Sequence, residues 1–464
     1  MAVFGQVHET RQKSALSGWG NLAMRIRQPW SLASVLLAAA QLAPGIALGQ
    51  EPPQPVVNLQ FNFSDPGARS LGFGGSFIGL ADDATAAFAN PAGLVQLGRP
   101  EVSIEGRRTS YSTPYTERGR VEGEPSGFGI DNTVGLRTAR SDDEVSGLSF
   151  LSVAYPRGKW SWAFFRHQLA DFELLSETQG LFGGGTDCCQ QRFFDYRTRN
   201  DFDFVNYGLA GAYRVTETLS LGLGVTYLDA SLLATTNVYG IDDDTVEAIF
   251  GLNSYLPERS IYREVVTIED TDWVLTGGFL WTVSRGWKIG GVYRQGPQVE
   301  VDTVLVAGAL IDFGVPPGEE VARSPRARVE FPSFLGLGVV YRAPGDRLTI
   351  SCQWDRIEYA NIPESLGAGD LTVDDADEFR VGGEYVFRRP KTMVALRVGA
   401  WLDPDHQLRA IVEDPLTRAL APPGKDEMHY AAGIGVAFNR FQIDFGVDLS
   451  DRVDTASISA IYSF

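Results

Sequence analysis

Cysteine is scarce in this sequence, and its spacing could not organise a fold. Of the 464 residues only Cys188, Cys189 and Cys352 are cysteine. Two adjacent cysteines cannot join distant elements, so a disulfide framework is excluded, and no spacing resembles a zinc site. A bond between Cys188 and Cys189 would be geometrically awkward, even in an exported loop.

Histidine is also rare, which argues against an enzyme. The chain has four histidines, and His167, His406 and His429 lie in unrelated segments without a serine motif or a metal-binding cluster. We therefore expect no catalytic residues, no metal and no cofactor. Basic residues are outnumbered too: 40 lysines and arginines against 58 acidic residues give a net charge of −18, which argues against nucleic acid as a partner.

Long apolar runs are missing beyond the N-terminus, so a membrane protein built from helices is excluded. The N-terminus itself has the parts of an export signal: a basic stretch at 24–27, an apolar stretch at 30–47, and a small-residue cleavage site after Gly49. Residues 1–23 lack this character, so we expect translation to start at Met24. The alternative is a buried N-terminal helix.

What the sequence has instead is a two-residue alternation from Glu101 onward. In residues 441–449, Phe, Ile, Phe, Val and Leu alternate with Gln, Asp, Gly and Asp. Successive side chains of a strand point to opposite faces, so this pattern predicts strands with one apolar and one polar face. The overall apolar content of 44% does not reveal such strands, because alternation hides their hydrophobicity in an average.

About fourteen segments of roughly ten residues show this pattern, which is the length that a tilted strand needs to cross a bilayer. They are 101–111, 144–155, 158–169, 202–214, 218–230, 272–283, 286–297, 332–342, 347–357, 377–388, 391–402, 427–438, 441–450 and 454–464. Short and long connections alternate between them, and the longest lie at 231–271 and 298–331. The sequence therefore predicts an all-β fold: a transmembrane antiparallel β-barrel with short turns on the periplasmic side.

The last segment ends in Phe464, with Ile458 and Tyr462 on the same face of the strand. A final strand ending in Phe resembles the signal that the outer-membrane assembly machinery reads. A soluble sandwich would also alternate, but it would need neither an export signal nor this alternation of loop lengths. We therefore expect the protein in the bacterial outer membrane.

Residues 64–98 do not alternate. They are small and glycine-rich, and they end in a turn at Asn90-Pro91-Ala92-Gly93. A nucleotide-binding loop is excluded because Phe77 stands where the third glycine of that motif would be. The composition predicts a compact, close-packed segment, and we expect it to plug the barrel.

This segment resembles the start of the FadL family of outer-membrane transport proteins. The resemblance rests on Leu-Gly-x-Gly-Gly-x-Phe at 71–77, Ala-Asp-Asp-Ala-x-Ala at 81–86 and Asn-Pro-Ala-Gly-Leu at 90–94, and it extends over the mature chain. It implies a fourteen-stranded barrel at 99–464 with a hatch at 50–98, after a removed segment at 1–49. The implied hatch and gating residues are Gly72, Gly74, Gly75, Asp82, Asp83, Asn90, Pro91, Ala92 and Gly93.

The resemblance also implies passive uptake of hydrophobic molecules, such as long-chain fatty acids or hydrocarbons, that lipopolysaccharide blocks at the outer leaflet. An external apolar groove would lie between the loops 231–271 and 298–331. The groove candidates are Phe250, Leu252, Tyr255, Leu256, Leu305, Leu310 and Phe313. The alternative is that these side chains pack on each other and cap the barrel.

Four basic residues should face the lumen by strand parity: Lys288, Arg294, Arg380 and Arg397. They could hold a fatty-acid carboxylate. Alternatively they pair with inward carboxylates, namely Asp355, Glu378, Glu384, Asp444 and Asp448, because barrel interiors are polar in any case.

The same barrel would also suit two other functions, a protein-binding component of a secretion or assembly system and an aqueous porin. The expected partners are a hydrophobic small molecule, lipopolysaccharide and the assembly machinery, with the protein acting as a monomer. In the family, ligand leaves sideways near a kinked third strand, but residues 160–167 contain no proline or glycine to form such a kink.

Overall fold

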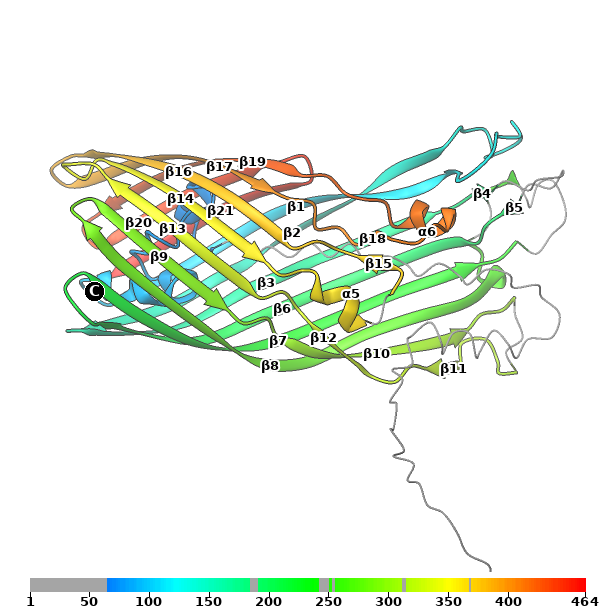
Figure 1. Cartoon of the computed structure of the whole chain (residues 1–464), viewed down its shortest axis with the longest axis horizontal. Helices are drawn as coiled ribbons and strands as arrows, with labels where there is room; N and C mark the ends of the chain where they lie inside the picture. The colour runs from blue at the N-terminus through cyan, green and yellow to red at the C-terminus, as the bar shows by residue number, and fades with distance from the viewer. Residues whose placement is uncertain (1–64, 184–190, 242–249, 253–254, 311–313, 367–368) are drawn as a thin grey trace, which may run out of the picture.

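The computed structural model describes residues 65–183, 191–241, 250–252, 255–310, 314–366 and 369–464. They form a closed antiparallel barrel of fourteen strand positions, in which the first strand pairs with the last (Figure 1). The expected export signal and the pair Cys188–Cys189 lie outside the described residues, as does Phe313. No described helix is long and apolar enough to span a membrane.

Twelve positions are single strands and two are interrupted, which confirms the predicted number of strands. In order they are β1 (Glu101–Arg120), β2 (Leu136–Arg157), β3 (Trp160–Thr178), β6 (Asp195–Arg214), β7 (Leu219–Tyr239), β8 (Ser260–Ser284), β9 with β10 (Trp287–Arg294, Gln298–Ala307), β12 with β13 (Ala327–Glu330, Phe334–Arg342), β14 (Leu348–Ile357), β16 (Ala376–Arg388), β17 (Thr392–Asp403), β19 (Glu427–Phe438), β20 (Phe441–Leu449) and β21 (Val453–Ser463).

Several strands are longer than the sequence predicts. The stretches 231–271 and 298–331, expected as loops, begin or end inside β7, β8 and β10. The reason is that alternation does not stop at the membrane: Leu232, Ala234 and Val238 continue the buried face of β7 beyond the expected end of that strand. On this side the barrel wall thus extends well beyond the strand ends that the sequence predicts. We call this side the loop end, and the side with the short hairpins and Phe464 the turn end.

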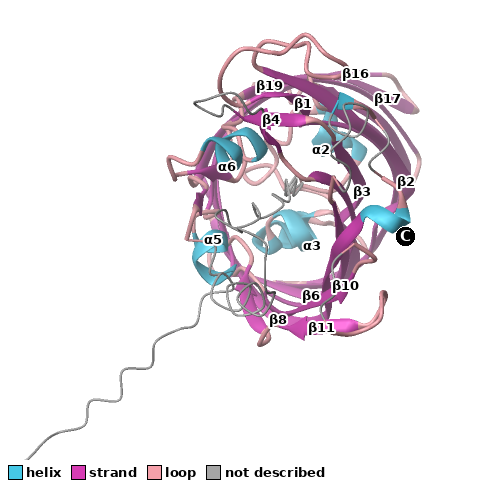
Figure 2. Cartoon of the chain, turned by 90° about the vertical axis from the view of Figure 1, so that its right-hand side faces the viewer, coloured by secondary structure: helices cyan, strands magenta, loops and turns pink. Residues whose placement is uncertain are grey.

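Several short helices and strands lie at the loop end. They are β4 (Leu181–Gly183), β5 (Gln191–Arg192), η2 (Pro257–Arg259), β11 (Glu320–Arg323), α5 (Asn361–Leu366), β15 (Leu371–Thr372), β18 (Arg409–Ala410) and α6 (Pro415–Leu420). The pairing of β15 with β18 and the bond from the Thr116 hydroxyl to the Ala419 carbonyl fold two long loops inward over the lumen (Figure 2).

The outer face of the turn-end half is apolar. Leu223, Trp273 and Val398 are each more than 60% exposed there, which in water would be penalised but suits contact with lipid chains. On neighbouring strands the directly paired Tyr207, Tyr227 and Trp273 mark where this apolar face gives way to polar residues such as Asp203 and Asp229. Aromatic residues at such a boundary are typical of a membrane interface.

Inside the turn-end half lies the N-terminal segment, residues 65–98, with α2 (Ala68–Gly72), α3 (Ala86–Ala89) and η1 (Pro91–Gln96) (Figures 1 and 2). Nearly all of it is buried, and its short helices contact strands on opposite sides of the barrel, including β7 and β20. Compact, glycine-rich backbone fits here because the lumen leaves no room for large side chains on both partners.

Candidate functional site

The floor of the lumen is made by backbone of the N-terminal segment lying directly on backbone of the wall. Four pairs of directly opposed glycines provide the contact surface: Gly222 with Gly278, Gly290 with Gly338, Gly382 with Gly399, and Gly433 with Gly446. A Cβ on Gly399 would lie 2.4 Å from the Gly74 nitrogen, and one on Gly222 would lie 2.2 Å from the Ala92 nitrogen. Any larger side chain at these positions would displace the segment.

Three of the four predicted hatch glycines lie at this contact, and the fourth, Gly93, packs within the segment. Gly72 approaches Gly433, and Gly74 approaches Ala400 with a φ of +65°. Gly75, with a φ of +71°, lies against the Arg380 guanidinium, and a Cβ on Gly93 would meet the Ala81 carbonyl oxygen at 2.1 Å. Glycine is needed at 74 and 75 for both reasons, the left-handed backbone and the missing space.

Two further contacts tie the segment to the wall. Asp82 binds Arg69 at 2.6 Å and Arg342 of β13 at 2.9 Å, while Asp83 accepts hydrogen bonds from Thr85. The Asn90 amide donates to the carbonyls of Ile78 and of Phe279 in β8, both at 3.0 Å, and its oxygen accepts from the Ala92 amide. Pro91 and Ala92 begin η1, so this turn fixes both a helix start and a wall contact.

Above this floor, one side of the lumen is apolar. Most of its buried side chains come from β3 through β14, with others from α5, β16 and the loops, and they form one contiguous cluster, in which Phe172 stacks on Phe202 at 4.4 Å and Phe204 meets Phe331 at 5.2 Å. Other members are Leu228, Leu232, Ile268, Val299, Val301, Ile357 and Tyr359. These side chains are buried against one another, so this part of the barrel interior is packed with apolar groups, as is unnecessary in a water-filled pore.

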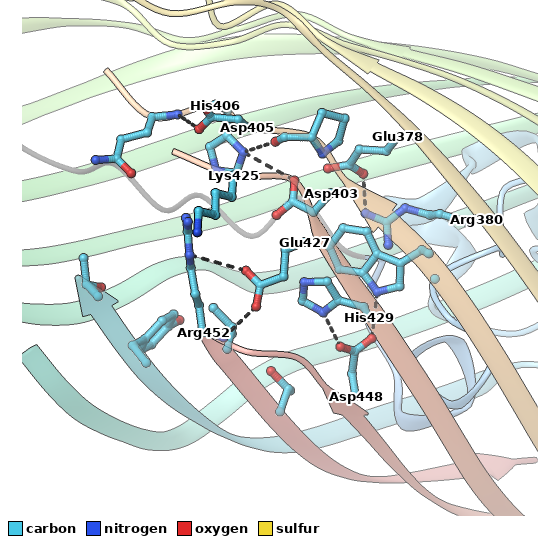
Figure 3. Close-up of a pocket in the computed structure, with 18 of the residues that line it drawn as sticks. Glu378, Arg380, Asp403, Asp405, His406, Lys425, Glu427, His429, Asp448 and Arg452 are labelled. Carbon is cyan, nitrogen blue, oxygen red and sulfur yellow. Dashed lines mark hydrogen bonds and ion pairs between the residues drawn. The ribbon is translucent and has the colours of Figure 1, made fainter. Parts of the chain in front are cut away.

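The opposite side of the lumen is charged (Figure 3). A pocket there is lined from β1, β16, β17, β19, β20 and β21, and most of its charged groups are paired with each other, although no ion pair is recorded for Lys425 among the described residues. The His429 imidazole bonds to Asp448, and the Trp401 indole donates to the same carboxylate at 2.8 Å. Tyr111 of β1 lines this pocket and also packs on Phe172 at 5.6 Å, so the pocket adjoins the apolar cluster.

The four basic residues predicted to face the lumen do so, and each already has a partner. Arg397 binds Glu384 and Asp444, both at 2.7 Å, and Arg380 binds Asp355 at 3.0 Å and also Glu378. Arg294 binds Asp65 at 3.1 Å and lies over the Phe88 ring, while Lys288 donates to Gln96. Pairing with the expected inward carboxylates therefore describes Arg380 and Arg397, whereas Arg294 and Lys288 bind Asp65 and Gln96 of the N-terminal segment.

His406 lies in the loop after β17 and closes one side of the pocket. Its ring stacks on Tyr359 at 4.8 Å and lies 3.3 Å from the Asp403 carboxylate. Burial alone would lower the pKa of His406, but the Asp403 carboxylate and the Pro404 carbonyl outweigh it and raise the pKa to about 9. The imidazolium therefore helps to hold this loop in place at neutral pH.

The described groove candidates make several separate contacts. Phe250 stacks on Phe182 and contacts the Phe128 ring at a tilt, Tyr255 packs on Tyr239 and donates to the Tyr196 carbonyl, and Leu310 packs near Tyr196. Leu305 is buried in β10, whereas Leu252 and Leu256 are exposed at the loop end. Phe250, Tyr255 and Leu310 thus contact neighbouring loops and strands.

The wall is interrupted beside β3. Pairing with β2 ends at His167, and the register with β6 shifts between Gln168 and Ala170, so that the buried face changes from Phe165 and His167 to Phe172. A β-bulge between Gln168 and Ala170 therefore bends β3, although this part of the strand contains no proline or glycine. Beyond it, the side chains of Asp143 and Ser141 accept from the amides of Glu173 and Leu175, in place of strand carbonyls.

Sequence reasoning missed the wall glycines and the bridging aspartates. The glycines carry a signal, because eight of them fall on the inward parity of eight strands, which marks a close approach of backbone. The role of Asp143 depends on a strand separation that no local pattern reveals.

No protein-family model matches the sequence. Outer membrane protein P1 of Haemophilus influenzae is 26% identical over 428 residues, which covers 82% of this chain and 82% of that protein. Among solved structures, a Pseudomonas aeruginosa FadL homologue superposes with a TM-score of 0.59 at 14% identity, over 89% of this chain and all of that one.

Two toluene transporters have the same fold. TbuX of Ralstonia pickettii has a TM-score of 0.50 at 15% identity, and TodX of P. putida has 0.51 at 12%, each over 87% of this chain and 99% of theirs. Together with the barrel, these comparisons confirm the predicted resemblance and location: the chain has the fold of the solved FadL homologue and is similar to outer-membrane proteins.

Proposed function

We propose that this barrel carries hydrophobic small molecules passively across the outer membrane. The observation that carries the proposal is the apolar cluster inside the lumen, above the N-terminal segment. Burying an apolar molecule there is favoured by roughly 0.8 kcal/mol per CH₂, so ligand capture needs no energy source. The likeness to toluene transporters supports the same function.

Uncharged ligands fit this lumen better than fatty-acid anions. Arg294, Arg380 and Arg397 are each engaged by carboxylates of the protein. At any of these three arginines, a fatty-acid carboxylate would have to break a buried pair and leave a protein carboxylate without its partner, which is costly. A hydrocarbon makes no such demand, and we expect it to be the preferred cargo.

In this proposal ligand collects at the exposed apolar residues of the loop end, such as Leu252 and Leu256, and enters the apolar cluster. The N-terminal segment acts as the hatch, and it closes the direct route to the turn end. Ligand that cannot pass the hatch leaves sideways, and the interrupted wall beside β3 offers one such route.

Three further expectations belong to this proposal. The barrel works as a monomer, lipopolysaccharide surrounds its outer half, and the assembly machinery binds its C-terminal strand. The exposed Phe464, whose amide donates to the Pro100 carbonyl, suits that last role because it extends the strand at the turn end.

Whole-cell uptake of labelled toluene and oleate tests the transport function. Leu228→Gln places a polar group in the apolar cluster, and Leu233→Gln makes the same change on the outer face of the same strand. We expect Leu228→Gln to slow toluene uptake while Leu233→Gln and Leu228→Met leave it near the unmodified rate. Equal rates for all variants, or no uptake dependent on the protein, would overturn the proposal.

A further inference from the structure

The wall has a second interruption, between β8 and its neighbour. β8 is continuous, but the neighbouring strand breaks at residues 295–297, between β9 and β10. β8 pairs with β9 from Thr276 and with β10 up to Thr267. Between these limits the described residues include one backbone bond across the gap, from the Gln295 amide to the Leu275 carbonyl at 3.0 Å. We call this stretch, Ile268–Leu275 of β8 and 295–301 opposite, the β8 window.

The break also turns the strand over. Before it the even-numbered Val292 and Arg294 face the lumen, and after it the odd-numbered Val299 and Val301 do. On its other side the break stays attached to the next strand: the Phe331 amide donates to the Pro297 carbonyl at 2.8 Å, and a Cβ on Gly296 would lie 2.0 Å from the Phe331 oxygen. The separation is therefore confined to the β8 side.

Two aspartates of β8 bridge the window. In Asp272, one carboxylate oxygen accepts from the Trp273 amide of its own strand and the other from the Gln298 amide opposite, both at 2.8 Å. Asp270 does the same with the Thr271 and Glu300 amides, again at 2.8 Å. Side-chain hydrogen bonds replace backbone pairing here. To open the window, a few of these bonds have to be exchanged for bonds to water, and no continuous run of backbone hydrogen bonds has to break.

The lumen side of the window is apolar, and its outer side is apolar at the turn-end limit, before the exposed Thr271 and Glu269. On the lumen side lie Ile268, Val299 and Val301, all buried in the apolar cluster proposed to hold ligand. On the outer side Trp273 and Leu275 are exposed within the window itself, at the aromatic boundary where lipid chains meet head groups. A hydrophobic molecule moving from one side to the other would leave one apolar environment for another.

We propose that the β8 window is a lateral portal through which uncharged hydrophobic molecules pass between the lumen and the outer leaflet, with Asp270 and Asp272 as its clasp. This inference rests on the proposed transport function and adds a route to it. The portal lies away from β3, and its turn-end limit at Trp273 and Leu275 reaches the level of the lipid chains.

Reversible crosslinking tests the portal. Cysteines replace Asp272 and Gln298 in a chain whose Cys188, Cys189 and Cys352 are serine, and a short bifunctional thiol reagent that reductant cleaves joins them. The same treatment of Ser231 and Glu269, which pair directly across the closed boundary of β7 and β8, is the matched control. A third pair, Asp143 and Glu173, closes the interruption beside β3.

We expect crosslinked Asp272→Cys/Gln298→Cys cells to lose most of their toluene uptake and to regain it on reduction, which excludes misfolding. The Ser231/Glu269 crosslink should change nothing. If the β8 crosslink leaves uptake intact while the Asp143/Glu173 crosslink stops it, the portal is wrong and the transport function stands. If the unmodified barrel takes up no toluene, both proposals fail.

Discussion

The two interruptions of the wall use the same bridge in different surroundings. Beside β3, one oxygen of Asp143 accepts from the amide of the next residue, Glu144, and the other accepts from Glu173 opposite, both at 2.7 Å. Asp270 and Asp272 repeat this arrangement in the β8 window. An aspartate is short and has two acceptor oxygens, so it can serve both strands where their backbones have separated.

The difference lies on the outer face. Beyond His167, the outer side of β3 carries Asp171 and Glu173, and the facing part of β2 carries Asp142 and Glu144. The β8 window instead carries Trp273 and Leu275 at its turn-end limit, followed by the exposed Thr271 and Glu269. The first interruption therefore lies where the outer surface is polar, whereas the second begins where that surface is still apolar. The same aspartate bridge can thus occur where the outer surface is polar or apolar. We expect the outer side chains to determine which molecules can cross.

The largest effect is expected when the N-terminal segment no longer closes the lumen, because molecules then need neither interruption to pass. Gly399→Leu would place a side chain where the Gly74 nitrogen lies 2.4 Å from the Cβ position, so the N-terminal segment cannot seat. We expect ion conductance in planar bilayers to rise to that of an open pore. Gly211→Leu, where the nearest atom to a new Cβ is 3.8 Å away, is the control. Unchanged conductance in Gly399→Leu would show that the segment does not seal the lumen.

A smaller effect is expected from the outer face of the β8 window. Trp273→Lys puts a charge at its lipid side and should lower toluene uptake several-fold. Trp281→Lys makes the same change on the same face of β8, outside the window, and should leave uptake per assembled barrel unchanged. Equal losses in the two variants would remove the distinction drawn between the window and the rest of the wall.

Removing one aspartate bridge should affect only the interruption in which it lies. Asp272→Ala removes one acceptor worth about 1 kcal/mol, so we expect exchange of the Gln298 amide hydrogen to quicken by about fivefold. The Glu173 amide should not change, and Asp143→Ala should have the reverse pattern. Hydrogen exchange read by mass spectrometry measures both sites in one sample. Joint acceleration in either variant would mean that the two interruptions open together.

The smallest effect concerns the loop over the charged pocket. Because the folded structure raises the pKa of His406 from 6.5 to about 9, the stabilisation is complete below pH 6.5 and is lost as the pH rises through 9. We expect tryptic cleavage at Arg409 to accelerate between pH 7 and pH 9.5, beyond the change in trypsin activity. His406→Gln should remove that extra acceleration. Neither interruption should respond, since His406 touches neither bridge.

Local sequence patterns predict most of the barrel, but they predict only part of the candidate site. Alternation places Arg380 and Arg397 on the inner face correctly, because strand parity needs no knowledge of neighbours. Their partners come from other strands, so pairing with Asp355 or Asp444 depends on register. Where a strand turns over, as at Leu169 or Gly296, parity counting fails, and the predicted loop 298–331 contains strand for this reason.

One contact made by the N-terminal segment also bears on the order of assembly. The Gly67 amide donates to Glu105 of β1 at 2.8 Å, and the Ala68 amide donates to Ser459 of β21 at 3.3 Å. These acceptors belong to the first and the last barrel strands, which become neighbours only when the cylinder closes. The seat for the beginning of this segment does not exist on the nascent sheet. A segment that precedes every barrel strand in the chain can thus dock fully only after the last strand has closed the cylinder.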